Sequence, residues 1–229
     1  MQLFWREVYR KVIHLALTAL LVLPYFVTLP SPLNIYNYYS LGLLAASVIN
    51  SFVVKRFKLE LELNTLKGEL HRFADSLGEK ARMPLSIIED AIEEFHSFIE
   101  KQLSLLERDY EKREGYVGLL YGMIGATSSL LLDPLHAFYG VTALAVVDVT
   151  ASLSSLILWK RGKSLGGEII AFGTYTLFLG LMGVPLPQGM TSALLVTLTE
   201  YFSPEDNLTV PVVATVVSSL LGLPAISPS

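Results

Sequence analysis

Residues 136–159 read HAFYGVTALAVVDVTASLSSLILW, an apolar run of the length that a membrane-spanning helix needs. The run contains no Lys or Arg, and its single carboxylate, Asp148, lies near the middle. The turn residues Asp133-Pro134 precede the run, and the basic segment 160–163 follows it. A helix that crosses a bilayer and ends in a basic loop is the interpretation that this stretch favours.

The composition of the whole chain agrees with this interpretation. Of the 229 residues, 52% are hydrophobic and only 17% are charged, and the mean hydropathy is +0.51. A soluble domain of this length cannot bury so much apolar side chain, so the bilayer has to act as the solvent for much of it. Cysteine is absent, which excludes disulfides and cysteine-based metal chemistry. The net charge of −4 argues against nucleic acid as a partner.

The 17 basic residues are confined to three segments of the chain. Three lie near the N-terminus, eleven lie between Lys55 and Arg113, and the last three lie within 160–163. With the N-terminus in the cytoplasm, all three segments fall on the cytoplasmic side, as the positive-inside rule requires. The expected spans cover about 12–30, 36–54, 115–132, 136–159, 165–184, a short run at 189–202, and 208–223.

These patterns predict an all-α, polytopic membrane bundle of about seven spans. Spans one and two occupy 1–54, a charged segment occupies 55–113, and the remaining spans occupy 114–229. In the charged segment, apolar residues recur at helical spacing on both sides of a break between Gly78 and Pro84. We expect a cytoplasmic helical hairpin there, with a structural role such as homodimer formation. The membrane is the plasma membrane if the source is prokaryotic, and an ER-type membrane if it is eukaryotic.

Asp148 is the first candidate site residue. An ionised carboxylate inside hydrocarbon costs about 3 kcal/mol or more, so such a residue needs an explanation. One explanation is a hydrogen bond that holds helices together, with Thr150 and Ser152 as nearby partners. The other is a functional site, and the size of the cost favours this second explanation.

A second set of oxygen ligands lies near the C-terminus. Glu200 ends the short sixth run, and Asp206, Asn207 and Thr209 follow closely. Carboxylates with an amide beside them are ligands of the kind that Mg²⁺ prefers, although a polar turn between two helices is the alternative. Irregular backbone at membrane depth is tolerated only where protein buries it or where it lines a polar cavity. We therefore expect this turn to reach into the protein interior.

The start of the fifth span has features of a phosphate site. Lys163 and Ser164 open the span, and Gly166 and Gly167 follow. Free backbone N–H groups and the helix dipole favour an anion at such a helix N-terminus. The positive-inside signal explains the basic residues here equally well.

The N-terminal segment presents another group of polar side chains. Glu7, Arg10, Lys11 and His14 are separated by helical spacings, so one helix face can present all four. Arg10 and Lys11 can be explained as a topology signal. His14 lies just inside the apolar run, where that explanation does not apply.

In this order along the chain, the segments resemble the CTP-dependent lipid-alcohol kinases. This family includes dolichol kinase, phytol kinase and the yeast-type diacylglycerol kinase, and is distantly related to the phosphatidate cytidylyltransferases. The matching segments are Glu7 with Arg10, Lys11 and His14; Arg108-Asp109-Tyr110-Glu111 leading to Gly115 and Gly122; Asp148 and Ala151 before Lys163-Ser164-Leu165-Gly166-Gly167; and Glu200 with Asp206-Asn207-Leu208-Thr209-Val210-Pro211. The last match is the most specific. The chain departs from the family pattern at Val147, Ser155 and Glu168.

The resemblance implies an enzyme that moves the γ-phosphate of CTP to the hydroxyl of an isoprenoid alcohol from the bilayer, with Mg²⁺ as cofactor. It implies Asp148, Glu200 and Asp206 as metal ligands and catalytic carboxylates. His14 or one carboxylate would assist removal of the alcohol proton. The residues implied for the nucleotide phosphates are Arg10, Lys11, Lys163, Ser164, Gly166, Gly167, Asn207 and Thr209, with Glu7 and Glu111 in support. A cytidylyltransferase that makes a CDP-lipid, and a non-catalytic membrane scaffold or transporter, remain the alternatives.

Overall fold

The computed structural model describes residues 2–51, 117–160 and 162–228, together with Thr65, Glu94 and Ser97. Regular structure in these residues is helical throughout, as expected for the all-α class. The chain divides into two compact units, Met1–Ser47 with Val117–Ser229 and Val48–Tyr116. The helices described below belong to the first unit, except that residues 48–51 of the helix over 35–51 fall in the second unit. The hairpin predicted over 55–113, with Glu111, lies outside the described residues apart from the three isolated positions.

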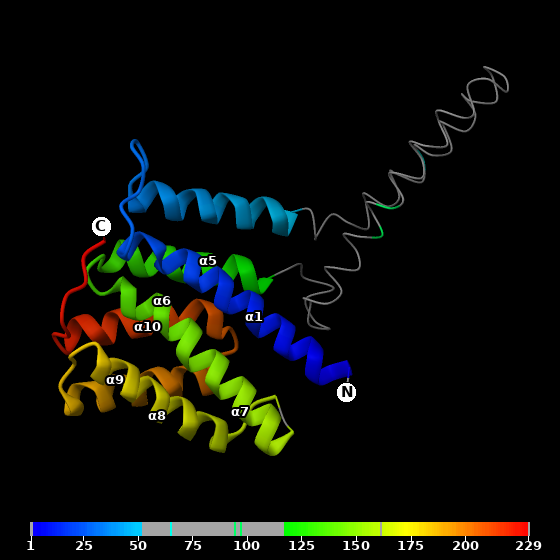
Figure 1. Cartoon of the computed structure of the whole chain (residues 1–229), viewed down its shortest axis with the longest axis vertical. Coiled ribbons are helices and arrows are strands. Elements are labelled where there is room, and N and C mark those ends of the chain that lie inside the picture. Colours follow the sequence, from blue (N-terminus) through cyan, green and yellow to red (C-terminus); the bar gives the residue numbers. More distant parts are fainter. Residues whose placement is uncertain are drawn as a thin grey trace. The chain divides into compact units, whose positions relative to one another are not determined.

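The first unit is a bundle of helices, seen in Figure 1. Its elements are α1 (Gln2–Val22) with the 3₁₀ turn η1 (Leu23–Tyr25), a helix over 35–51, α5 (Val117–Leu132), α6 (Ala137–Ala143), the π-helical turn η2 (Leu144–Asp148), α7 (Val149–Trp159), α8 (Leu165–Leu181), α9 (Leu186–Phe202) and α10 (Asp206–Leu220). The elements α6, η2 and α7 form one continuous helix over the apolar run quoted at the outset. Helix α10 packs against α5, α6 and α9, and α8 packs against both α7 and α9.

Two helices in the described residues are long and apolar enough to cross a membrane, Glu7–Tyr25 and Ala137–Trp159. Shorter apolar helices cover Gly118–Leu132, Leu165–Leu181 and Asp206–Leu220. Large apolar side chains are also exposed on the outside of the bundle. The most exposed, at 70% or more, include Leu131, Ile169, Leu181, Phe202 and Leu220. Exposed apolar surface of this extent marks contact with lipid or with another protein, which agrees with membrane association.

Two boundaries of the expected spans are wrong in an informative way. The first helix begins at Gln2 instead of about residue 12, so it includes the polar residues Glu7 and Arg10, which form an ion pair of 2.8 Å. The sixth run is not a short segment over 189–202 but the helix Leu186–Phe202. Pro185 is its N-cap residue and Pro187 lies in its first turn, where proline is well tolerated.

One end of the bundle is closed by the C-terminal tail. The Ile226 N–H donates to the Leu135 carbonyl at 2.9 Å, and the Tyr139 hydroxyl donates to the Pro224 carbonyl at 2.8 Å. The Gln188 amide donates to the Leu221 carbonyl at 2.9 Å. The turns before α6 and at the start of α9 therefore lie at the same end as the tail.

Glycines bring α7 and α8 close together. A Cβ at Gly167 would meet the Ser155 hydroxyl oxygen, and it would lie 2.6 Å from the Ala151 carbonyl oxygen. Small residues at such positions let helix backbones approach closely, which is a principal source of helix association in membranes. The packing of α8 on α7 fixes the start of α8, and with it the loop that carries Lys163.

Gly167→Ala is expected to destabilise the bundle by about 1–3 kcal/mol, because the added methyl group overpacks the α7–α8 contact. Gly173→Ala on the same helix is the matched control, since a Cβ there meets no atom within 4 Å. That variant is expected to be neutral or stabilising by up to about 1 kcal/mol, from helix propensity alone. Unfolding of both purified variants in one detergent measures the difference, and equal stability would contradict the packing.

Candidate metal and phosphate site

Asp148 lies at the end of the π-helical turn, inside the bundle, and is only 3% exposed. π-Helical turns are rare and occur frequently at functional sites. The Lys11 ammonium, from α1, donates to both carboxylate oxygens of Asp148 at 2.7 and 2.8 Å. The expected help from Ser152 is present as a contact of 3.4 Å, whereas the Thr150 hydroxyl donates to the Val146 carbonyl instead. The expectation for Thr150 is therefore wrong, because its own helix satisfies the hydroxyl.

Glu200 and Asp206 lie on the two sides of the turn that joins α9 to α10. Glu200 is in the last turn of α9 and fully buried, and Asp206 is the first residue of α10 and 5% exposed. The Lys163 ammonium lies 3.0 Å from Glu200 Oε1 and 3.2 Å from Asp206 Oδ2, and it donates to the Glu200 carbonyl at 2.7 Å. Lys163 thus pairs with the carboxylates of Glu200 and Asp206 and also hydrogen-bonds the C-terminal end of α9.

The surroundings of Lys163 keep it charged. Burial acts to lower the pKa of Lys163, but the carboxylates of Asp206 and Glu200 outweigh burial and hold the pKa above its ordinary value. The ammonium is therefore a cation at neutral pH. Its charge offsets part of the negative charge of Glu200 and Asp206.

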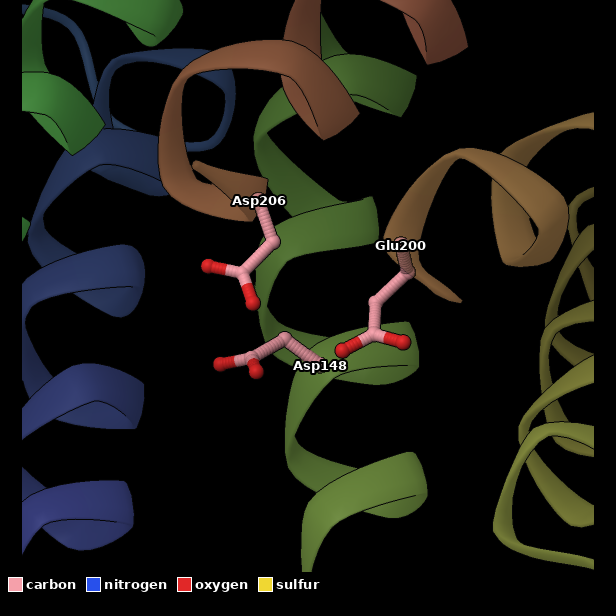
Figure 2. Close-up of side chains that lie close together, drawn as sticks. All are labelled: Asp148, Glu200 and Asp206. Atoms are coloured by element: carbon pink, nitrogen blue, oxygen red, sulfur yellow. The ribbon is translucent and has the colours of Figure 1, made fainter. Parts of the chain in front are cut away.

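The three carboxylates form one cluster. Each of Asp148, Glu200 and Asp206 offers an oxygen, and these oxygens all lie within 4.8 Å of one another. Figure 2 shows the three side chains turned toward a common space from three different helices. All three are buried, and a set of hard oxygen donors of this kind can hold a metal ion.

The charges in the cluster do not balance without a further cation. Among the described residues, the three carboxylates of Asp148, Glu200 and Asp206 pair with two ammonium groups, those of Lys11 and Lys163, and His14 lies at the edge. Unbalanced charge in a buried site is costly. A divalent cation bound together with an anionic ligand is a combination that this arrangement of carboxylates and lysines can accommodate.

The remaining residues of the N-terminal group are divided. His14 Nε2 lies 3.7 Å from Asp148 Oδ2, so His14 belongs to the edge of the cluster. The Arg10 guanidinium instead pairs with Glu7 at 2.8 Å. The structure therefore brings Lys11 and His14 to the carboxylates, whereas Arg10 pairs with Glu7 on the same helix.

The residues at the start of α8 have local structural roles. The Ser164 hydroxyl accepts a hydrogen bond from the Gly167 N–H at 3.1 Å, so it caps the helix, and it also lies 2.9 Å from the Ser155 hydroxyl. A Cβ on Gly166 would collide with the Trp159 ring. These contacts fix the loop that presents Lys163, and the phosphate contacts implied for Ser164, Gly166 and Gly167 stay predictions.

Asn207 and Thr209 shape the turn that carries Asp206. The Thr209 hydroxyl lies 2.6 Å from the Ser203 hydroxyl and donates to the Glu205 carbonyl at 3.1 Å. The Asn207 backbone N–H donates to Asp206 Oδ1 at 2.9 Å, which orients that carboxylate. Their implied contacts with a nucleotide stay predictions.

Glu168 is a member of this region that sequence reasoning treated only as a departure from a family pattern. It is 7% exposed, and its charged neighbours include Glu200, Lys163 and Asp148. Its carboxyl is hydrogen-bonded to that of Glu200, and no other group of the described residues donates to its oxygens. The signal that could have identified it is the one applied to Asp148, an ionisable residue within an apolar span.

Comparisons of the chain with protein-family models, with curated proteins and with solved structures found no match. What the site does is therefore inferred from the chemistry of its residues and from the motif resemblance in the sequence.

Proposed function

We propose that this chain is a multi-pass membrane kinase that transfers the γ-phosphate of CTP to the hydroxyl of an isoprenoid alcohol, with Mg²⁺ as cofactor. The observation that carries the proposal is the buried cluster of Asp148, Glu200 and Asp206, flanked by Lys11 and Lys163. Catalysis of phosphoryl transfer consists mainly of positioning and neutralising charge, and this cluster has the groups for both. CTP and the lipid alcohol come from the motif resemblance.

Asp148, Glu200 and Asp206 are the residues that would hold Mg²⁺, since all three present oxygen donors to the same space. When bound there, Mg²⁺ supplies neutralisation of the charge on the nucleotide phosphates. Lys163 and Lys11 each neutralise carboxylates in this structure and would contact phosphate oxygens when a nucleotide binds. Arg10 adds positive charge on the same helix as Lys11, and His14 or one carboxylate accepts the alcohol proton.

The position of the site supports access from the cytoplasm. Lys163 lies in the basic segment 160–163, and Lys11 follows the basic residues of the N-terminus. The turns gathered at the tail end of the bundle, 133–136 and 182–188, contain no Lys or Arg. By the positive-inside rule, the site end faces the cytoplasm and the tail end faces away, as in a seven-span arrangement.

Cysteine labelling tests this orientation cleanly, because the native chain has no cysteine. Gly162→Cys, in the basic segment, is expected to react with a membrane-impermeant maleimide only from the cytoplasmic side. Ser227→Cys, in the tail, is expected to react only from the opposite side. Labelling of both positions from one side would contradict the proposed topology.

Labelled CTP tests the reaction itself. Purified protein is incubated with Mg²⁺, a panel of prenols and diacylglycerol, and CTP labelled at either the α- or the γ-phosphate. The proposal predicts that only the γ-label reaches the lipid. Incorporation of the α-label would instead identify a cytidylyltransferase, and no incorporation with either label would leave the scaffold or transporter alternative.

A further inference from the structure

A groove of about 280 Å³ runs between α8 and α9. These two helices lie side by side, as Figure 1 shows and their packing confirms. Its lining is almost entirely apolar, and Leu165, Ile169 and Phe202 at its margin are among the most exposed side chains of the described residues. In a membrane, such a groove opens toward the lipid rather than toward water.

One wall of the groove connects it with the carboxylate cluster. Glu168 lines the groove and is nine-tenths buried. Its carboxyl is hydrogen-bonded to that of Glu200, and no other group of the described residues donates to its oxygens. Its carboxyl lies beside that of Glu200, which belongs to the metal-binding cluster. A buried carboxyl with acceptor oxygens still unused is stabilised when a ligand donates a hydrogen bond to it. A hydroxyl is the group that such a carboxyl can hydrogen-bond without adding charge.

We propose that the α8–α9 groove binds the chain of a single-chain lipid alcohol, and that Glu168 hydrogen-bonds its hydroxyl next to the carboxylate cluster. This inference rests on the proposed function for the reaction and the lipid alcohol, and it adds the binding site. The groove is near the lower limit of small-molecule pockets, roughly 300–1,000 Å³. It accommodates the first part of one chain, while the rest extends along the outside of the bundle. The groove holds a single chain, so a prenol binds with its only chain in the groove, whereas diacylglycerol would have to leave its second chain outside.

A photoreactive prenol with a diazirine near its hydroxyl tests the groove directly, with the full chain in lipid nanodiscs and without nucleotide. Cross-linked residues are expected on α8 and α9, at the groove. Unlabelled prenol is expected to compete about tenfold better than diacylglycerol, a difference of about 1.4 kcal/mol. Labelling of other helices, or equal competition by a hydrocarbon that lacks the hydroxyl, would overturn the proposal.

A pair of variants on α9 separates groove filling from general disturbance. Leu198 lines the groove and is 44% exposed, whereas Leu195 is 41% exposed and does not line it. Leu198→Trp is expected to reduce prenol cross-linking about tenfold. The indole ring would occupy space in the groove and displace about two methylene groups of the prenol chain, and burial of each group contributes about 0.8 kcal/mol. Leu195→Trp is expected to leave cross-linking unchanged, and equal effects of the two would contradict the proposal. The cross-link map of the unmodified protein gives an independent answer if Leu198→Trp fails to fold.

The role of Glu168 has its own readout. Glu168→Leu is expected to remove the preference for prenol over its hydroxyl-free hydrocarbon, a change of about fivefold for one hydrogen bond. An unchanged preference would remove Glu168 from the proposal. Failure of the two proposals is distinguishable: groove labelling without phosphate transfer contradicts only the kinase, and transfer with labelling elsewhere contradicts only the groove.

Discussion

Asp148→Asn is expected to lower Mg²⁺-dependent phosphate transfer to a prenol by roughly 10²–10³-fold, the effect of losing one strong electrostatic contact in an active site. The amide keeps the shape of the side chain but loses the charge that faces Glu200, Asp206 and Lys11. Because the proposed role is metal binding, the loss is expected to depend on the metal concentration. Initial rates measured across a Mg²⁺ series, at saturating CTP and prenol, give both quantities.

Asp133→Asn is the matched control for this experiment. Asp133 is an aspartate just before the helix Ala137–Trp159, which contains Asp148. It lies at the tail end of the bundle, where it pairs with His136 at 2.7 Å. Its replacement is expected to leave the rate within about twofold, because this pair is not part of the carboxylate cluster. If Asp148→Asn retained full activity, Asp148 would not be a metal ligand and the kinase proposal would lose its main support.

Lys11→Met is expected to destabilise the folded protein by about 3–5 kcal/mol, because it leaves the buried Asp148 carboxylate without its partner. The Lys11 ammonium donates to both Asp148 oxygens, and both side chains are 4% exposed. Methionine matches the length and flexibility of lysine, so the lost charge dominates over lost packing. Unfolding of the variant by denaturant in detergent, compared with the native protein, measures the effect.

The double variant Lys11→Met/Asp148→Asn shows whether the two residues form a unit. Removing the unpaired charge is expected to restore much of the stability, giving a coupling of about 2–3 kcal/mol, which is within the range for contacting residues. Additive losses would contradict the pairing. The double variant is also expected to stay inactive, which separates the contribution of the pair to stability from the function of Asp148.

The elements of the bundle were largely predictable, because apolar length and the position of basic residues are strong signals. The run around Asp148 became one continuous helix, Ala137–Trp159, close to the predicted 136–159. What the pattern could not show was the π-helical turn Leu144–Asp148, because no residue type marks it. The hydroxyl of Thr150 was likewise misassigned, because its bond to the local backbone competes with any bond to Asp148.

The cluster of Asp148, Glu200 and Asp206 could be suspected from sequence because each carboxylate is anomalous beside apolar residues. Their distances depend on how α9 and α10 pack against η2, which local patterns do not encode. For the same reason, the sequence pattern did not identify Glu168 as a site residue or reveal the α8–α9 groove. The groove exists only between two packed helices, and Glu168 becomes a candidate once its burial and its neighbours are known.

Mn²⁺ binding, followed by electron paramagnetic resonance of the purified protein, tests the central claim most directly. Mn²⁺ prefers the same oxygen ligands as Mg²⁺ and has a spectrum that reports its coordination. The native protein is expected to bind Mn²⁺, with release by excess Mg²⁺, and Asp206→Asn is expected to weaken the binding at least about tenfold. Equal Mn²⁺ binding by the native protein and by Asp206→Asn, or none by either, would contradict a metal site at Asp148, Glu200 and Asp206.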